Sequence, residues 1–272
     1  MIGYNVILAQ PANYPHSMAL WDIGRLLHYS FASLGRTSTL RINELDSQAV
    51  NVLLGYHLVA AESIPKGYDC IIYQLEQLSD KEGWFNATRL AVLQRAREIW
   101  DFSPDNIAFL KGKGLNNLKL LPIGFHEALR AIPHATQDVD VLFYGSMNAR
   151  RQKIFDELRQ RCRLETIYGL YGAQRDAWIA RAKIVLNVHY YQTKIMEQVR
   201  VSYLLNNGCC VISEDSPANP FSGMIADVAY EQITQTCLDY LKNTELRENQ
   251  AQRGLELFRQ RPMVECLRRV LD

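Results

Sequence analysis

The chain has 272 residues, of which 48% are hydrophobic and 22% charged, a composition typical of a soluble globular protein and unlike that of a disordered or fibrous one. Thirty basic and 29 acidic side chains leave a formal net charge of +1, which excludes a global positive field that would attract nucleic acid. No run of 18 apolar residues occurs and the start of the chain lacks the pattern of a secretory signal, so we expect no transmembrane segment and a cytoplasmic location.

The first half of the chain alternates short β-branched runs with helical patterns, which predicts an α/β domain built on a doubly wound parallel sheet. Ligands of such sheets bind beyond the carboxyl ends of the strands, and His16 lies in the loop that follows the first strand. The predicted strands are residues 4–9, 37–42, 50–54, 69–74, 98–102 and 118–121. The predicted helices are residues 18–34 and 88–97.

Residues 128–137 contain Pro133 and have no clear periodicity, so they are the predicted linker to a second domain. The same alternation of strands and helices resumes after this linker. The predicted strands are residues 139–143, 164–168, 182–188, 209–213 and 228–230. The predicted helices are residues 150–162, 174–181, a helix from about 196 that stops at Asn207-Gly208, and then 233–243, 245–260 and 264–271.

The first strand of the second half is followed directly by Gly145 and Ser146. A glycine at this position lets the backbone approach a phosphate, and the cations Arg150, Arg151 and Lys153 that follow can neutralise a diphosphate. The loop has neither the GxxxxGK(S/T) pattern of a Walker loop nor a GxGxxG. The alternative is that Arg151 and Lys153 occupy solvated helix positions.

Residues 181–214 place a helix between two buried strands and gather polar residues that have no packing role. The free N–H groups and the dipole of the helix start favour an anion there. Lys194 and Arg200 add full positive charges that suit a phosphate. The polar residues of this loop and first turn are His189, Lys194, Glu197 and Arg200.

A set of motifs between residues 138 and 215 carries a resemblance to a known family. Its members are Tyr168-Gly169, Arg181-Ala182-Lys183, Leu186-Asn187, Glu197, Arg200, Tyr203, Gly208 and Ser213-Glu214. The segment resembles the donor-binding half of glycosyltransferases with two facing Rossmann-like domains, the GT-B architecture, and more narrowly the group-1-like domains that include CgeB-type proteins. Many retaining members carry two glutamates separated by seven residues, and Leu205 stands where the partner of Glu197 would be.

The resemblance implies an α/β fold of two Rossmann-like domains whose parallel sheets face a cleft. Residues 1–132 would form the acceptor-side domain, residues 133–260 the donor-binding domain, and a terminal helix in 261–272 would pack back on the first. It also implies a hexosyltransferase-like enzyme that moves a sugar from a nucleotide diphosphate sugar to a hydroxyl of a glycan, protein or small molecule. The donor-binding residues implied are Gly145, Ser146, Arg150, Arg151, Tyr168, His189, Lys194 and Arg200.

Transfer to a hydroxyl needs a base or an assisting carboxylate. His16 is the first candidate for the base because it follows the first strand, although a lone histidine is more often a packing residue. Glu197 is the second catalytic candidate; alternatively it begins the helix and pairs with Arg200. Weaker candidates are His57, Glu76, His126 and His189.

Neither a metal ion nor a resident cofactor is expected. The pair Asp138 and Asp140 matches the DxD pattern of a metal-bridged diphosphate, but acids commonly mark the start of a strand at a domain boundary. The six cysteines contain no CxxC pair, so reduced thiols are predicted, and no His/Cys/Asp cluster has ligand spacing. Fixed cations and helix-end amides can instead stabilise the leaving diphosphate.

Two further hypotheses stay open from the sequence. The chain is short for a two-domain transferase and lacks the second glutamate, which favours a non-catalytic module that keeps the fold and binds a nucleotide or glycan. A sugar-nucleotide epimerase or hydrolase on the same fold would need a second carboxylate or histidine close to the sugar carbon.

Overall fold

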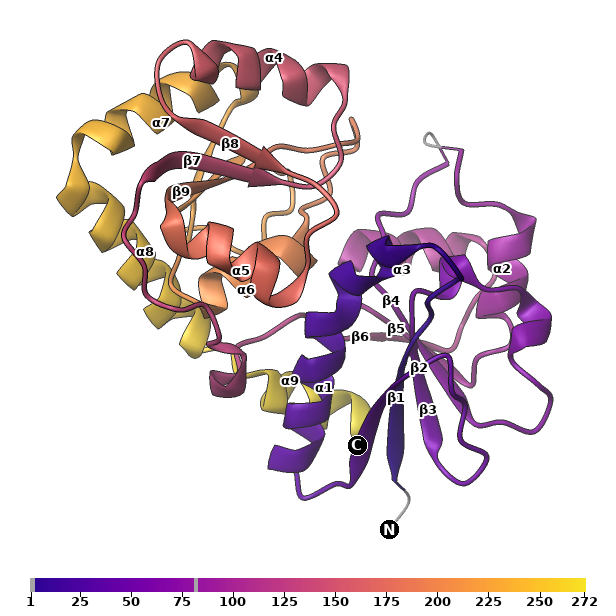
Figure 1. Ribbon diagram of the computed structural model, residues 1–272. Helices are drawn as coiled ribbons and strands as arrows, with labels where there is room; N and C mark the ends of the chain where they lie inside the picture. Colours follow the sequence, from indigo (N-terminus) through magenta and orange to yellow (C-terminus); the bar gives the residue numbers. More distant parts are fainter. Residues whose placement is uncertain (1–2, 81–82) are drawn as a thin grey trace. The chain divides into compact units, whose positions relative to one another are not determined.

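The computed structural model describes residues 3–80 and 83–272 and divides the chain into two compact units. The first unit is Met1–His126 together with Pro262–Asp272, and the second is Glu127–Arg261. Figure 1 shows two α/β units, the first mostly indigo to purple and the second mostly red-brown to yellow, and each has its own sheet. Within the described ranges, no helix combines the length and the apolarity needed to cross a bilayer.

The first unit is built on a six-stranded sheet with the order β2-β1-β3-β4-β5-β6, and every pairing in it is parallel. In the register, Val6 lies between Leu40 and Val52. The strands are β1 (Tyr4–Leu8), β2 (Ser38–Ile42), β3 (Val50–Leu54), β4 (Cys70–Gln74), β5 (Glu98–Asp101) and β6 (Leu118–Leu120). All residues of β3 and β4 are buried, as expected for central strands covered on both faces.

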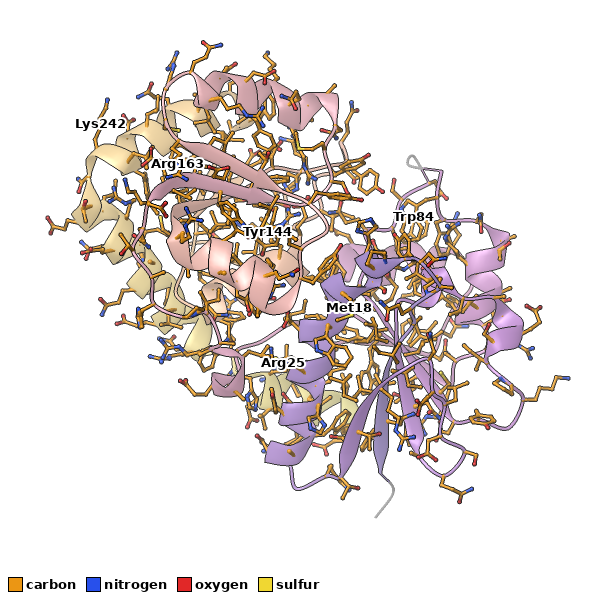
Figure 2. All side chains as sticks on the ribbon, in the orientation of Figure 1. Met18, Arg25, Trp84, Tyr144, Arg163 and Lys242 are labelled. Carbon is orange, nitrogen blue, oxygen red and sulfur yellow. The ribbon has the colours of Figure 1, made fainter. Side chains whose placement is uncertain are left out.

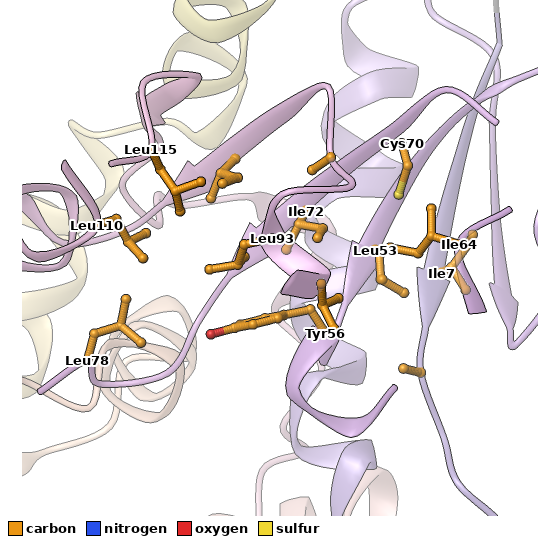
Figure 3. Close-up of a cluster of buried hydrophobic side chains, with 14 residues drawn as sticks. Ile7, Leu53, Tyr56, Ile64, Cys70, Ile72, Leu78, Leu93, Leu110 and Leu115 are labelled. Atoms are coloured by element: carbon orange, nitrogen blue, oxygen red, sulfur yellow. The ribbon is translucent and has the colours of Figure 1, made fainter. Parts of the chain in front are cut away.

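Helices cover both faces of this sheet. One face carries a core in which Leu93 and Leu110 pack with the strands (Figure 3). The 3-10 turns are η1 (Pro15–Leu20), η2 (Tyr56–Leu58) and η3 (Ala61–Ser63), and the α-helices are α1 (Trp21–Ser33), α2 (Ala87–Leu93), α3 (Pro104–Gly112) and α9 (Met263–Leu271). Helix α2 ends earlier than predicted, and α3 is a helix that the sequence patterns did not predict.

Helix α9 returns the end of the chain to the first unit. It lies beside α1 (Figure 1), and it buries Met263, Leu267 and Val270, which recur at helical spacing. The ammonium of Lys119, in β6, donates to the carbonyl oxygen of Val270 at 2.7 Å. The last helix is therefore packed as part of the first unit.

The second unit is built on a five-stranded sheet with the order β11-β10-β9-β7-β8, again with parallel pairings. The strands are β7 (Val139–Tyr144), β8 (Leu164–Ile167), β9 (Ala182–Asn187), β10 (Val211–Glu214) and β11 (Ala226–Val228). The helices are α4 (Ala149–Arg159), α5 (Gly172–Arg181), α6 (Gln198–Asn206), α7 (Ile233–Lys242) and α8 (Thr244–Arg259), with the 3-10 turns η4 (Glu127–Leu129) and η5 (Tyr230–Gln232). Strand β11 starts before the predicted residues 228–230, the last of which opens η5.

In both units the first strand has the second strand on one side and the third on the other. The strand order therefore reverses beside the first strand. In doubly wound sheets, ligands bind at this reversal, in the crevice beyond the carboxyl ends of the first and third strands. In the second unit these two strands are β7 and β9. Gly145 follows β7, and His189 follows β9 by two residues.

Candidate functional site

Gly145 and Arg200 lie in direct contact beyond the carboxyl ends of β7 and β9. Gly145 has φ +135°, and a Cβ atom built there would lie 2.5 Å from Nη2 of Arg200. The Arg200 guanidinium lies 5.2 Å from the ring centroids of Phe143 and of Tyr144, the residue labelled in Figure 2. Its Nη1 donates to Oδ1 of Asn187 at 2.7 Å. Only glycine provides both this backbone conformation and this approach.

Arg200 keeps hydrogen-bonding capacity that the protein does not use. Its Nε is buried and has no hydrogen-bond partner, and within residues 3–80 and 83–272 no carboxylate forms an ion pair with its guanidinium. A buried guanidinium N–H without a partner is costly, because arginine is a strong donor. Arg200 therefore keeps a donor group that no acceptor among the described residues uses.

Glu197, the residue before α6, is held by His189. The Oε2 atom of Glu197 lies 2.8 Å from Nδ1 of His189 and accepts from Nδ2 of Asn187 at 3.0 Å. Burial by itself would raise the pKa of Glu197, but the hydrogen bond and charge of His189, followed by the charge of Arg200, lower the pKa to about 2. The other His189 nitrogen, Nε2, lies 3.0 Å from the carbonyl oxygen of Asp215.

Two other predicted cations form ion pairs with acidic residues at the end of β10. Arg150 makes a two-pronged ion pair with the fully buried Glu214, and its guanidinium stacks 4.0 Å from the ring centroid of Tyr230. Lys194 donates to Asp215 at 2.9 Å and lies 3.2 Å from Glu214. The Asp215 hydrogen bond raises the pKa of Lys194. The Lys194 pair fixes the loop between β9 and α6 against β10, and the Arg150 pair fixes the start of α4 there.

Arg151 lies beneath the loop that follows β7. It is 2% exposed and donates to the carbonyl oxygens of Val188, at 2.8 Å from Nε, and Ser146, at 2.7 Å. Burial, and then the charge of Arg200, lowers the pKa of Arg151 to about 10. Arg151 thus ties the ends of β7 and β9 together, and Ser146 contributes its carbonyl group to this contact.

The remaining predicted residues lie elsewhere. Tyr168 follows β8 and is 58% exposed, at the same edge of the sheet as Gly145. His16 is in the first unit, within η1, with its ring 5.3 Å from that of Tyr14. His126 also belongs to the first unit, where its Nε2 lies 3.2 Å from the hydroxyl of Ser33.

The sequence patterns gave no role to three residues that organise the site: Asn187, Glu214 and Asp215. Asn187 links Glu197 to Arg200 and also donates to Ser213 at 3.0 Å. Asn187 and Glu214 are polar residues that end apolar strands, and this signal was present in the sequence.

No metal site emerges from the part of the chain that the structure describes, where no group of three His, Cys, Asp or Glu side chains could hold an ion. Asp138 and Asp140 lie at the amino end of β7, at the opposite edge from Gly145. Asp138 is paired with Arg181 and Asp140 with Lys183. All six cysteines are free thiols.

Comparison with known sequences finds relatives of undescribed activity. No family model matches the chain. The uncharacterized protein L140 of Acanthamoeba polyphaga mimivirus is 26% identical over 254 residues, which cover 86% of this chain and 81% of the viral protein. Two further uncharacterized proteins of the same virus, L138 and L137, are 30% and 27% identical, and the matches span only 13% and 26% of their lengths.

Comparison with solved structures identifies the fold. The glycosyltransferase AviGT4 of avilamycin A biosynthesis superposes with a TM-score of 0.60 at 13% identity, covering 98% of this chain and 96% of AviGT4. The DNA-modifying β-glucosyltransferase gives 0.59 at 11% identity, with 98% of both chains covered. TarM of S. aureus, in complex with UDP, gives 0.58 at 10% identity over 83% of this chain and 55% of TarM. The chain therefore has the GT-B fold of glycosyltransferases, with two Rossmann-like α/β domains.

Proposed function

We propose that this protein is a glycosyltransferase that moves a sugar from a nucleotide diphosphate sugar to a hydroxyl acceptor, without a metal ion. The observation that carries the proposal is Arg200, a cation with an unpartnered buried Nε at the crevice between β7 and β9. A diphosphate supplies the anionic oxygens that such a guanidinium binds. The GT-B fold supports the proposal independently.

The charge balance of the crevice also supports an anionic ligand. Glu214 and Asp215 are neutralised by Arg150 and Lys194. Glu197 forms an ion pair with Arg151, whose Nη2 lies 3.6 Å from Oε1 of the carboxylate. The charge of Arg200 is then left for the ligand, and the dipole of α6, which begins at Gln198, adds to the positive potential.

In the proposed reaction, a base removes the proton of the acceptor hydroxyl and its oxygen bonds to the anomeric carbon. The bond from that carbon to the diphosphate breaks, and the nucleotide diphosphate leaves with both electrons. Arg200 stabilises the charge that develops on the leaving group. His16 is the proposed base and Glu197 the proposed carboxylate that holds the sugar, both at the carboxyl edges of their sheets.

The test is release of nucleoside diphosphate from a panel of UDP-, GDP- and TDP-sugars, with and without EDTA. UDP-sugars come first, because UDP and uridine diphosphoglucose are named with TarM and the β-glucosyltransferase. We expect release that resists EDTA, falls strongly in Arg200→Ala, and persists in the control Arg159→Ala, an exposed residue of α4. Nucleotide binding without any release would instead identify a binding module, and loss of release on adding EDTA would contradict the metal-independent reaction.

A further inference from the structure

The backbone of residues 188–190, directly after β9, is held by side chains from the start of α4. Strand β9 ends at Asn187, which is paired with Ser213 of β10. Three consecutive carbonyl oxygens then accept hydrogen bonds from side chains. These bonds join Arg151 to Val188 at 2.8 Å, Arg150 to His189 at 3.3 Å and Asn148 to Tyr190 at 2.9 Å. The start of α4 therefore fixes the path of the chain as it leaves the sheet.

A single ion pair holds both backbone groups of His189. The N–H of His189 donates to Oε2 of Glu214 at 3.2 Å, and its carbonyl oxygen accepts from Arg150. Arg150 and the fully buried Glu214 also bind each other through two hydrogen bonds. Tyr230 supports this arrangement, because its hydroxyl donates to the carbonyl oxygen of Arg150 at 2.6 Å. Charge-assisted bonds of this kind are short and strongly directional.

The position of His189 in turn affects that of Glu197. Nδ1 of His189 lies 2.8 Å from Oε2 of Glu197, and the backbone N–H of Tyr190 donates to Oε1 at 3.4 Å. Arg200 is held by other contacts, namely its bond to Asn187 within β9 and its stacking on aromatic rings. A shift of residues 188–190 would therefore move partners of Glu197 and leave these contacts of Arg200 in place.

We infer that Arg150 and Glu214 are positioning residues, whose ion pair fixes His189 and, through it, the carboxylate of Glu197 for sugar transfer. The inference rests on the transferase function proposed above, in which Glu197 holds the sugar. It gives Arg150 a role different from the one expected for a cation after β7, which is to bind the diphosphate. The guanidinium of Arg150 instead binds Glu214 and His189.

The kinetic test compares the wild type with Arg150→Met, Glu214→Met and the double variant. We expect kcat for release of nucleoside diphosphate to fall about tenfold in each single variant and no further in the double variant, because both residues act through one contact. Affinity for the free nucleoside diphosphate should stay within about twofold, since Arg200 keeps its contacts. A fall in nucleotide affinity in Arg150→Met alone would identify Arg150 as a phosphate ligand and overturn the inference, as would losses of kcat that add in the double variant.

Loss of stability must be separated from loss of position. Removing one member of a buried ion pair is destabilising, whereas replacing both by apolar residues is often neutral, so the double variant should be more stable than either single variant. The matched control is Asp176→Asn, which removes a buried carboxylate whose partners are Arg175 and Tyr203. At a temperature where circular dichroism shows every variant folded, its kcat should stay within about twofold of wild type. An equal fall of kcat in this control would overturn the inference.

NMR of the histidine ring nitrogens tests the positioning without relying on activity, with the His189 signals identified by their loss in His189→Gln. We expect these signals to shift in Arg150→Met and Glu214→Met and to stay in place in Asp176→Asn. Unchanged His189 signals would overturn the inference whether or not the protein is a transferase. Shifted signals without release of nucleoside diphosphate by the wild type would contradict the transferase function and support the fixing of His189, so the two failures are distinguishable.

Discussion

Glu197 and His189 form a buried contact at the centre of the proposed donor site. Asn187 and Arg200 extend this contact to the crevice beside Gly145. A carboxylate held in this way favours its ionised form, and the pKa of Glu197 falls from 4.5 to about 2. Its charge state is therefore coupled to the free energy of unfolding.

The contribution of Glu197 to stability should depend on pH in one direction. Because its pKa is lowered on folding, the stabilisation is fully present above pH 4.5 and is lost as the pH falls from 4.5 towards 2. The shift corresponds to about 3 kcal/mol. Urea unfolding of the wild type and Glu197→Gln should give a constant difference between pH 5 and 7 that shrinks below pH 4.5. A difference that grows as the pH falls would contradict the ion pair.

Gly145→Ala tests the contact between the β7 loop and Arg200. The new Cβ would meet Nη2 of Arg200 at 2.5 Å, so the guanidinium must move and nucleotide affinity should fall about tenfold. The control is Gly172→Ala, which also has a positive φ but no atom within 4 Å of the new Cβ. Both variants carry backbone strain, of about 1 kcal/mol at φ +53° of Gly172 and more at φ +135° of Gly145, so the free energy of unfolding of each variant is measured beside its affinity. Equal nucleotide affinities of the two variants, measured by calorimetry, would show that Arg200 does not bind the nucleotide.

At the scale of elements, strands were predictable because their apolar runs are short and continuous. Strand β3 falls on the predicted residues 50–54, and β1 and β4 differ from prediction by a residue at one end. Helix α3 was missed because it buries only Asn106 and Leu110 and has no apolar stripe. The predicted 88–97 helix ends at Leu93, since the backbone of Arg97 already bonds to β4 through Cys70.

Helix α8 offers a test in which packing opposes helix propensity. Replacing Gly254 by alanine would favour the helix by about 1 kcal/mol in isolation. The added Cβ would, however, collide with the carbonyl oxygen of Met224 and lie 2.9 Å from Leu205. We expect a net loss of about 2 kcal/mol in the free energy of unfolding. The control Gly112→Ala, at the end of α3 with nothing within 4 Å, should be neutral or slightly stabilising.

At the scale of the whole molecule, the chain completes its first unit with its last helix. Leu267 of α9 is fully buried, so Leu267→Ala should lower the free energy of unfolding by about 2–5 kcal/mol. Nucleotide affinity at temperatures where the protein stays folded should remain within about twofold of wild type, because the donor-site residues belong to the second unit. The exposed Arg269→Ala is the matched control, expected within about 0.5 kcal/mol.

The position of the candidate site at the ends of β7 and β9 could be predicted from the sequence, whereas its charge pairing could not. The carboxyl ends of strands identify Gly145, His189 and Arg200 as neighbours. The ion pair between Arg150 and Glu214 joins residues 64 positions apart, and it depends on a strand order that local patterns do not contain. For this reason the sequence did not distinguish the predicted cations Arg150, Arg151, Lys194 and Arg200 from one another. In the described part of the chain, the first three form ion pairs with acidic residues and Arg200 does not.

The most direct measurement of the central claim is isothermal titration calorimetry of UDP, GDP, TDP, CMP and ADP with the wild type, Arg200→Lys and Arg200→Ala. We expect one nucleotide diphosphate to bind, with affinity reduced about 10- to 100-fold in Arg200→Ala and partly retained in Arg200→Lys. Equal affinity in the wild type and Arg200→Ala, or no binding of any nucleotide, would contradict a donor site at the crevice between β7 and β9.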